Sequence, residues 1–130
     1  MKVLIVEENR WATGYELQKD LKKNPKIEVL SCEFKNATLL LETWKIDVCA
    51  IDACRGPKRQ ISTAPLVSKI RKIFKGKMIA ISNIPCNRIP LKSAGCNFEC
   101  SKGRLAELLI RLSSDQPPRD QAEGNLSAVA

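Results

Sequence analysis

Histidine is absent from the sequence, and no two cysteines form a C-x-x-C pair. Histidine is the usual general base of enzymes, so its absence excludes most catalytic triads and any phosphohistidine carried by this chain. A structural zinc site normally draws on histidine and on closely spaced cysteines. The sequence therefore disfavours a zinc protein and the enzyme classes that depend on histidine.

Long apolar runs are also absent. None approaches the roughly 20 residues that a membrane helix needs, and Glu7 and Glu8 interrupt the first run too early for a signal peptide. We therefore expect a cytoplasmic protein without a membrane partner. Thiols stay reduced in that compartment, so we predict buried or half-buried free thiols instead of a disulfide framework. The cysteines are Cys32, Cys49, Cys54, Cys86, Cys96 and Cys100.

Positive charge is in excess: the net charge is +8, and much of it falls in one stretch. This basic stretch contains Arg55, Lys58, Arg59, Lys69, Arg71, Lys72, Lys75 and Lys77. Such a stretch can attract nucleic acid or an acidic protein, although it can also be a solvated helix face. Phe74 is the only aromatic residue within it, which argues against stacking on single strands. Nucleic acid is therefore not the partner that we expect.

Short apolar segments alternate with segments of helical periodicity. We predict strands at 2–6, 27–31, 48–51, 77–82 and 97–101, and helices at 9–24, 36–44, 64–74, 85–94 and 105–112. A loop is predicted at 55–57, where glycine and proline follow each other. Five strands that alternate with helices predict an α/β domain with a parallel sheet. We place this domain at 1–113 and a flexible tail at 114–130.

Polar residues stand where the predicted strands end. They are Glu7, Glu8, Asp52, Ser82 and Lys102. In parallel sheets the ligand site lies outside the carboxyl ends of the strands, so these side chains should converge. Clustered carboxylates need a counter-cation, and oxygen ligands at an accessible edge suit Mg²⁺. A hydroxyl and an ammonium beside a carboxylate suit a phosphoryl group.

Each of these residues also has a plainer interpretation. The acidic pair could cap the first helix, where negative charge favours the helix dipole. Asp52 could simply begin a loop, Ser82 could be an ordinary serine at a strand end, and Lys102 could begin a helix. Their joint occurrence in one order, each at the end of a strand, is what favours a site.

The sequence resembles the receiver domain of two-component response regulators over about residues 1–112. The resemblance is carried by Val-Glu-Glu at 6–8, Ile-Asp at 51–52, Ile-Ser at 81–82 and Ala-Gly-Cys-Asn-Phe-Glu-Cys-Ser-Lys at 94–102. It implies a flavodoxin-like (βα)5 fold, with a five-stranded parallel sheet of order 2-1-3-4-5 and helices on both faces. It also implies a stand-alone signalling module, not an enzyme, in which Asp52 accepts a phosphoryl group from a sensor histidine kinase. The output would be contact with a downstream partner protein.

The resemblance assigns the remaining roles residue by residue. Glu7, Glu8 and Asp52, with the backbone carbonyl of Cys54, would hold Mg²⁺. Ser82 would hydrogen-bond the phosphoryl oxygens, and Lys102 would pair with the phosphoryl charge.

Four residues depart from the family's pattern. Glu8 stands where the family nearly always has Asp, Asn83 where it usually has Ala or Gly, Glu99 at the switch aromatic, and Gly103 where Pro usually follows the lysine. Mg²⁺ tolerates poor octahedral geometry badly, so the longer Glu8 matters. These departures leave an alternative open: a pseudo-receiver that binds protein partners without phosphorylation. A basic nucleic-acid-associated domain is the third hypothesis.

Overall fold

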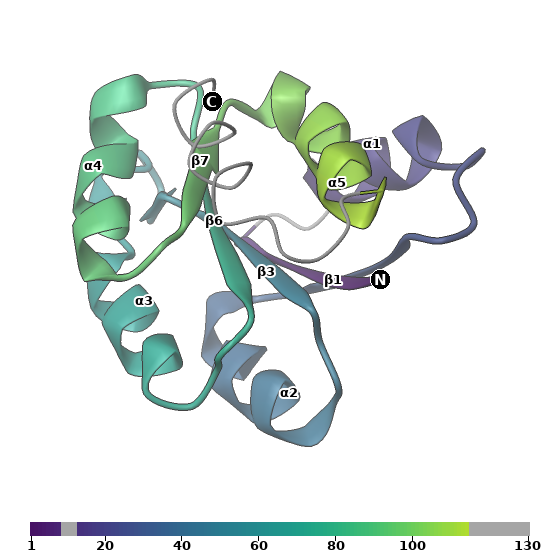
Figure 1. The fold of residues 1–130 in the computed structure, drawn as a ribbon. Coiled ribbons are helices and arrows are strands. Elements are labelled where there is room, and N and C mark those ends of the chain that lie inside the picture. Colours follow the sequence, from purple (N-terminus) through teal and green to yellow (C-terminus); the bar gives the residue numbers. More distant parts are fainter. Residues whose placement is uncertain (9–12, 115–130) are drawn as a thin grey trace.

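A five-stranded parallel sheet forms the centre of the computed structural model, which describes residues 1–8 and 13–114 (Figure 1). The strands are β1 (Lys2–Val6), β2 (Glu28–Cys32), β3 (Val48–Asp52), β6 (Lys77–Ile81) and β7 (Phe98–Cys100). Their order is β2-β1-β3-β6-β7. The predicted order 2-1-3-4-5 is therefore confirmed.

Helices cover both faces of the sheet (Figure 1). Helices α1 and α5 pack on one face, and α2, α3 and α4 pack on the other. Their bounds are α1 (Thr13–Asp20), α2 (Ala37–Thr43), α3 (Ala64–Arg71), α4 (Pro85–Ala94) and α5 (Leu105–Ser114). Short 3₁₀ turns, η1 (Phe34–Asn36) and η2 (Lys102–Arg104), precede α2 and α5. None of the helices within the described residues is long and apolar enough to cross a membrane.

The central strand β3 is buried along its whole length. Successive side chains of a strand point to opposite faces. Val48 and Ala50 accordingly contact the layer of α1 and α5, whereas Cys49 and Ile51 contact the layer of α2, α3 and α4. Burial on both faces explains why this strand is an apolar run without alternation.

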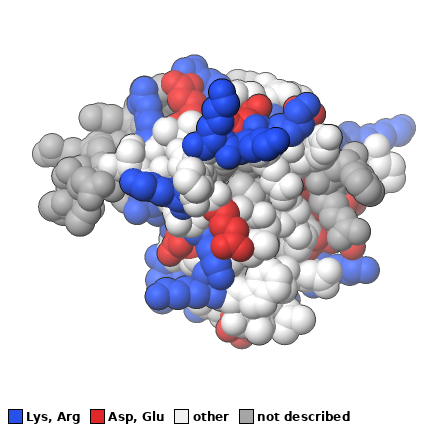
Figure 2. Space-filling view, turned by 90° about the vertical axis from the view of Figure 1, so that its right-hand side faces the viewer, with Lys and Arg blue, Asp and Glu red and all other residues white. Residues whose placement is uncertain are grey.

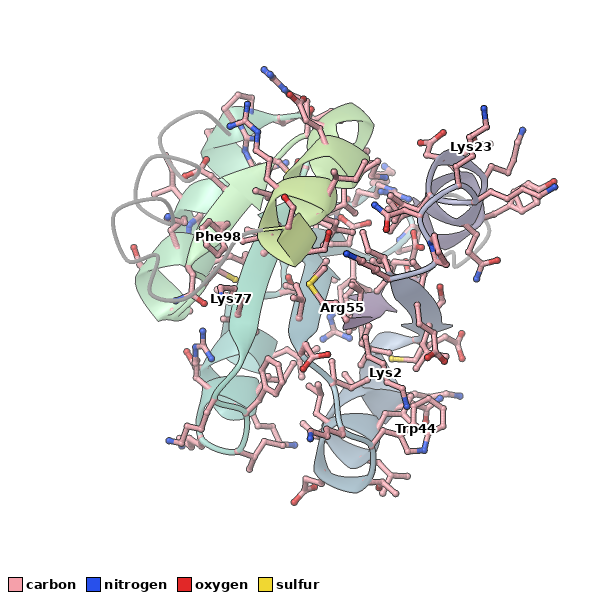
Figure 3. All side chains as sticks on the ribbon, turned by 45° about the vertical axis from the view of Figure 1, so that its right-hand side comes forward. Lys2, Lys23, Trp44, Arg55, Lys77 and Phe98 are labelled. Atoms are coloured by element: carbon pink, nitrogen blue, oxygen red, sulfur yellow. The ribbon has the colours of Figure 1, made fainter. Side chains whose placement is uncertain are left out.

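Two aromatic residues, Phe98 and Trp44, differ in how far they are buried (Figure 3). Phe98 on the edge strand β7 is fully buried and packs with the leucines of α5. Trp44, just after α2, keeps 44% of its surface exposed. Two buried side chains of the edge strand, Phe98 and Cys100, thus pack into this core cluster, although Glu99 between them is polar.

The structure corrects several predicted boundaries. Helix α3 ends at Arg71, earlier than predicted, and α1 is described only from Thr13 onwards. The predicted loop at 55–57 lies within a two-stranded antiparallel hairpin, β4 (Cys54–Arg55) with β5 (Ile61–Ser62). Strands of two residues are too short to show an alternating pattern. The predicted tail lies outside the described residues, apart from Ser114, which belongs to α5.

Helix α4 forms despite its two prolines. Pro85 occupies the first turn, where a backbone N–H would have no partner within the helix. Pro90 lies inside the helix and removes one backbone hydrogen bond there. Leu91, fully buried between α4 and the sheet, offsets that loss by burial.

All six cysteines are free thiols. Four are buried, namely Cys32, Cys49, Cys96 and Cys100, and Cys54 is half-buried. Burial or half-burial of these five thiols is as predicted, but Cys86 on α4 is exposed, contrary to expectation. Burial raises the pKa of Cys32 to about 11 and that of Cys96 and Cys100 to about 12.

Arg71, at the end of α3, joins three segments of chain. Its guanidinium donates hydrogen bonds to the carbonyls of Phe74 (2.9 Å), Gly76 (2.8 Å) and Gly95 (2.9 Å). It also donates to the side-chain oxygen of Asn97 at 2.6 Å. A member of the basic stretch therefore stabilises the fold instead of presenting its charge to a partner.

We predict that Arg71→Met lowers the free energy of unfolding by about 2–3 kcal/mol, because four hydrogen bonds are lost at a partly buried group. Urea denaturation measures this loss. Lys72→Met removes the same charge from an exposed neighbour and should change stability by less than about 0.5 kcal/mol. Equal effects of the two substitutions would contradict a specific role for Arg71.

We also predict that iodoacetamide at pH 8 modifies the exposed Cys86 well before the four buried thiols. The thiolate is the reactive form, and the raised pKa values leave little of it in the folded protein. Unfolding in urea returns these thiols toward their ordinary pKa of 9.0 and should make them react. Mass spectrometry of peptides follows each site, and modification of Cys96 as fast as Cys86 in the folded protein would contradict the prediction.

Candidate functional site

Asp52 lies at the carboxyl end of the central strand and is only 5% exposed. Lys102 begins the turn after β7, and its Nζ lies 3.9 Å from Asp52 Oδ2. Ser82 follows Ile81, which is the register partner of Asp52 on the neighbouring strand β6. The three residues predicted to handle a phosphoryl group thus stand at one edge of the sheet, and Asp52 and Lys102 form an ion pair there.

A second cation contacts Asp52, and sequence reasoning missed it. Arg59 Nη1 lies 3.0 Å from Asp52 Oδ2 and donates a hydrogen bond to it. Arg59 belongs to the connection between β4 and β5, where its own N–H donates to the Gly56 carbonyl at 3.0 Å. In the sequence, Arg59 stood out only as one residue of the basic stretch, and nothing there indicated which carboxylate it would contact.

Hydrogen bonds tie the β4–β5 hairpin to the end of β3. The Thr63 hydroxyl donates to the Asp52 carbonyl at 2.7 Å, and the Thr63 N–H donates to the Ala53 carbonyl at 3.0 Å. The Cys54 N–H donates to Asp52 Oδ1 at 3.4 Å. Burial and the Asp52 carboxylate both raise the pKa of the Cys54 thiol. Thr63 is a second residue that the sequence did not single out.

Glu7 is almost completely buried, and its carboxylate is engaged by helix α1. It accepts hydrogen bonds from the N–H groups of Thr13 (3.2 Å) and Gly14 (2.9 Å). These are donors of the first turn, which have no partner within the helix. The plainer interpretation of Glu7, as a cap of the first helix, therefore describes its contacts.

Glu8 is exposed and its carboxylate contacts the hairpin. Glu8 Oε2 accepts a hydrogen bond from the Gly56 N–H at 3.1 Å. Among residues 1–8 and 13–114, no three side chains of the types His, Cys, Asp and Glu are grouped so as to hold a metal ion. As they are placed, Glu7, Glu8 and Asp52 do not fit a shared Mg²⁺, because each carboxylate has a different partner within the protein.

Solved structures similar to this chain include receiver domains of response regulators. The receiver domain of Francisella response regulator 1452 is 22% identical with a TM-score of 0.67, over 86% of this chain and 92% of that one. The isolated receiver domain of RcsB from Salmonella enterica serovar Typhimurium, with the phosphomimetic BeF3−, is 14% identical with a TM-score of 0.70, over 97% of each chain. A Burkholderia pseudomallei response regulator, with a phosphorylated aspartic acid, calcium and citrate, is 16% identical with a TM-score of 0.69, over 96% of this chain and 73% of that one.

The chain has the receiver fold. No protein-family model matches the sequence, and no curated protein matches it. All three structures are less than 25% identical to the chain, so they show its receiver fold and not its chemistry.

Residues that depart from the receiver pattern have contacts of their own here. The side-chain oxygen of Asn83 accepts a hydrogen bond from the Lys102 N–H at 2.9 Å and so links the ends of β6 and β7. Glu99 forms an ion pair with the buried Arg88 of α4 at 3.3 Å. A Cβ at Gly103 would meet no atom within 4 Å, so packing alone does not require glycine there.

Ser82, which matches the receiver pattern, has a contact within its own loop. Its hydroxyl oxygen accepts a hydrogen bond from the Ile84 N–H at 3.1 Å.

Charged residues of both signs share the face of this receiver fold shown in Figure 2. Blue Lys and Arg side chains are interspersed there with red Asp and Glu side chains and with white surface. The blue side chains gather mainly in the upper part of this view, with red side chains among them. Within the basic stretch, Arg59 and Arg71 form contacts within the protein, although the Arg59 side chain keeps 44% of its surface exposed. On this face, the mixture of charges does not by itself single out nucleic acid as a ligand.

We predict that Glu7→Gln lowers the free energy of unfolding by about 1–2 kcal/mol in buffer with EDTA, because one amide oxygen replaces two carboxylate acceptors at the start of α1. Glu8→Gln is the matched control. It removes the same charge from an exposed side chain and should cost less than about 0.5 kcal/mol. Urea denaturation measures both variants. A Glu7→Gln variant as stable as the parent without divalent cations would contradict the capping role.

Proposed function

We propose that this chain is a receiver-type signalling domain in which Asp52 accepts a phosphoryl group from a partner histidine kinase. The observation that carries the proposal is the position of Asp52, at the end of the central strand with two cations against one carboxylate oxygen. This edge is where open parallel sheets bind their ligands. Ser82 follows the neighbouring strand and would contribute a hydroxyl.

The chemistry asked of these residues is simple. The bond from phosphorus to the donor's imidazole nitrogen breaks as a bond to an Asp52 carboxylate oxygen forms, and the imidazole leaves. The aspartyl phosphate carries more negative charge than the carboxylate did. Lys102 and Arg59 would offset the added charge, because charge-assisted hydrogen bonds to phosphate oxygens are strong. Rearrangement of this edge would then alter the surface that a downstream partner protein contacts.

A second candidate function is favoured by the ion pair between Arg59 and Asp52. In it, the chain is a pseudo-receiver that binds protein partners without phosphorylation. Asp52 already has its counter-charge, and neither Glu7 nor Glu8 is free to join it around a metal ion. The resemblance implies Mg²⁺ as the cofactor, so the dependence of phosphoryl uptake on Mg²⁺ has to be measured.

Intact-protein mass spectrometry after incubation with acetyl phosphate, with and without Mg²⁺, separates the two candidates. We expect a labile gain of one phosphoryl group that is absent from Asp52→Asn, which keeps the size of the side chain. Circular dichroism should show that both proteins are folded.

A folded protein that gains no phosphoryl group, from acetyl phosphate or from a panel of phosphorylated histidine kinases, would exclude the first candidate and leave the pseudo-receiver. A gain that persists in Asp52→Asn would place the acceptor elsewhere and would also contradict the proposal.

A further inference from the structure

We propose that Arg59 is the resident counter-cation of the Asp52 site and occupies the place that a divalent cation would need. The inference deepens the proposed function, because it concerns control of the same carboxylate. It also holds for the pseudo-receiver, since it describes access of cations to Asp52 and not phosphoryl transfer.

Protein groups surround both oxygens of the Asp52 carboxylate. Asp52 Oδ2 has Arg59 Nη1 at 3.0 Å and Lys102 Nζ at 3.9 Å. The other oxygen, Oδ1, faces the Cys54 N–H at 3.4 Å. Both oxygens of a nearly buried carboxylate thus have positive or hydrogen-bonding partners from the protein itself. A divalent cation at Oδ2 would have to displace the guanidinium or bind beside it against like charge.

The chain holds Arg59 in a disfavoured backbone conformation. Its φ is 50°, in the left-handed region, and among the described residues it is the only non-glycine with positive φ. Such conformations persist where the surroundings over-determine them, and they cluster at functional sites. Here the Gly56 carbonyl closes the turn, and Thr63 ties the hairpin to β3.

Glu8, a second carboxylate at this edge, is contacted by the same hairpin. The same hairpin that carries Arg59 also supplies the Gly56 N–H that Glu8 accepts at 3.1 Å. The hairpin therefore contacts two of the three candidate carboxylates, and helix α1 engages the third, Glu7. Gly56 has a φ of 97°, and a side chain at this position would be strained, so the turn depends on glycine. A divalent cation that binds Asp52 Oδ2 would therefore displace Arg59, with movement of its hairpin, or lie beside its like charge.

Calorimetric titration of the full chain with Mn²⁺, without any phosphoryl donor, tests the proposal. Arg59→Gln removes the charge and keeps a long polar side chain; we expect it to bind Mn²⁺ roughly tenfold or more tightly than the parent protein, because a unit charge beside the site is removed. Lys58→Gln removes the same charge from the exposed neighbouring position and should match the parent. Arg59→Lys restores the charge and should bind Mn²⁺ weakly again.

Adding Asp52→Asn to Arg59→Gln should abolish the gained affinity, which locates the ion at Asp52. Urea denaturation of each variant confirms that it is folded. If Arg59→Gln and the parent bind Mn²⁺ equally, or if Lys58→Gln strengthens binding as much as Arg59→Gln does, the proposal is overturned. Failure of phosphorylation would leave these titrations unchanged, so the two proposals fail separately.

Discussion

A carboxylate buried at the end of the central strand requires positive charge beside it. Strand β3 is covered on both faces, and Asp52 is its last residue. Asp52 therefore lies at the carboxyl end of the sheet, where polar groups from several elements meet. Burying an unpaired carboxylate is costly, and the protein supplies Arg59 from the hairpin and Lys102 from the turn after β7. The arrangement of this whole edge follows from that requirement.

The residues that depart from the receiver pattern, and the acidic pair beside them, form hydrogen bonds and ion pairs within the protein. The Glu7 carboxylate accepts a hydrogen bond from the backbone at the start of α1, and the Glu8 carboxylate accepts one from the hairpin turn. The Asn83 side chain links the ends of β6 and β7 through a hydrogen bond from the Lys102 N–H. Farther along β7, Glu99 pairs with the buried Arg88 and so joins α4 to the edge strand. Removing either member of such a pair leaves a poorly compensated charge, so both contribute to how α4 is positioned. Side chains that a metal-dependent receiver would direct at a ligand are here directed at the protein.

The fold was predictable because its signals are local and repeated. The run 48–51 is continuously apolar since both faces of β3 are buried, and helical spacing at 105–112 marks a helix that packs on one face. The convergence of Asp52 and Lys102 was predictable too, because parallel strands carry their carboxyl ends to the same edge. The β4–β5 hairpin was not, because each of its strands has only two residues and no alternation could appear.

By itself, the sequence determined the class of the domain, the strand order through the family resemblance, and which edge of the sheet carries Asp52. Only the tertiary structure decided which partner each charged side chain has. Short-range periodicity in the sequence predicts a strand or a helix. The partner of a long side chain such as Arg59 instead depends on the loop geometry, which here brings Asp52 Oδ2 within 3.0 Å of its guanidinium. That geometry depends on hydrogen bonds between residues far apart in the chain, such as Gly56 with Glu8, and no local pattern encodes them.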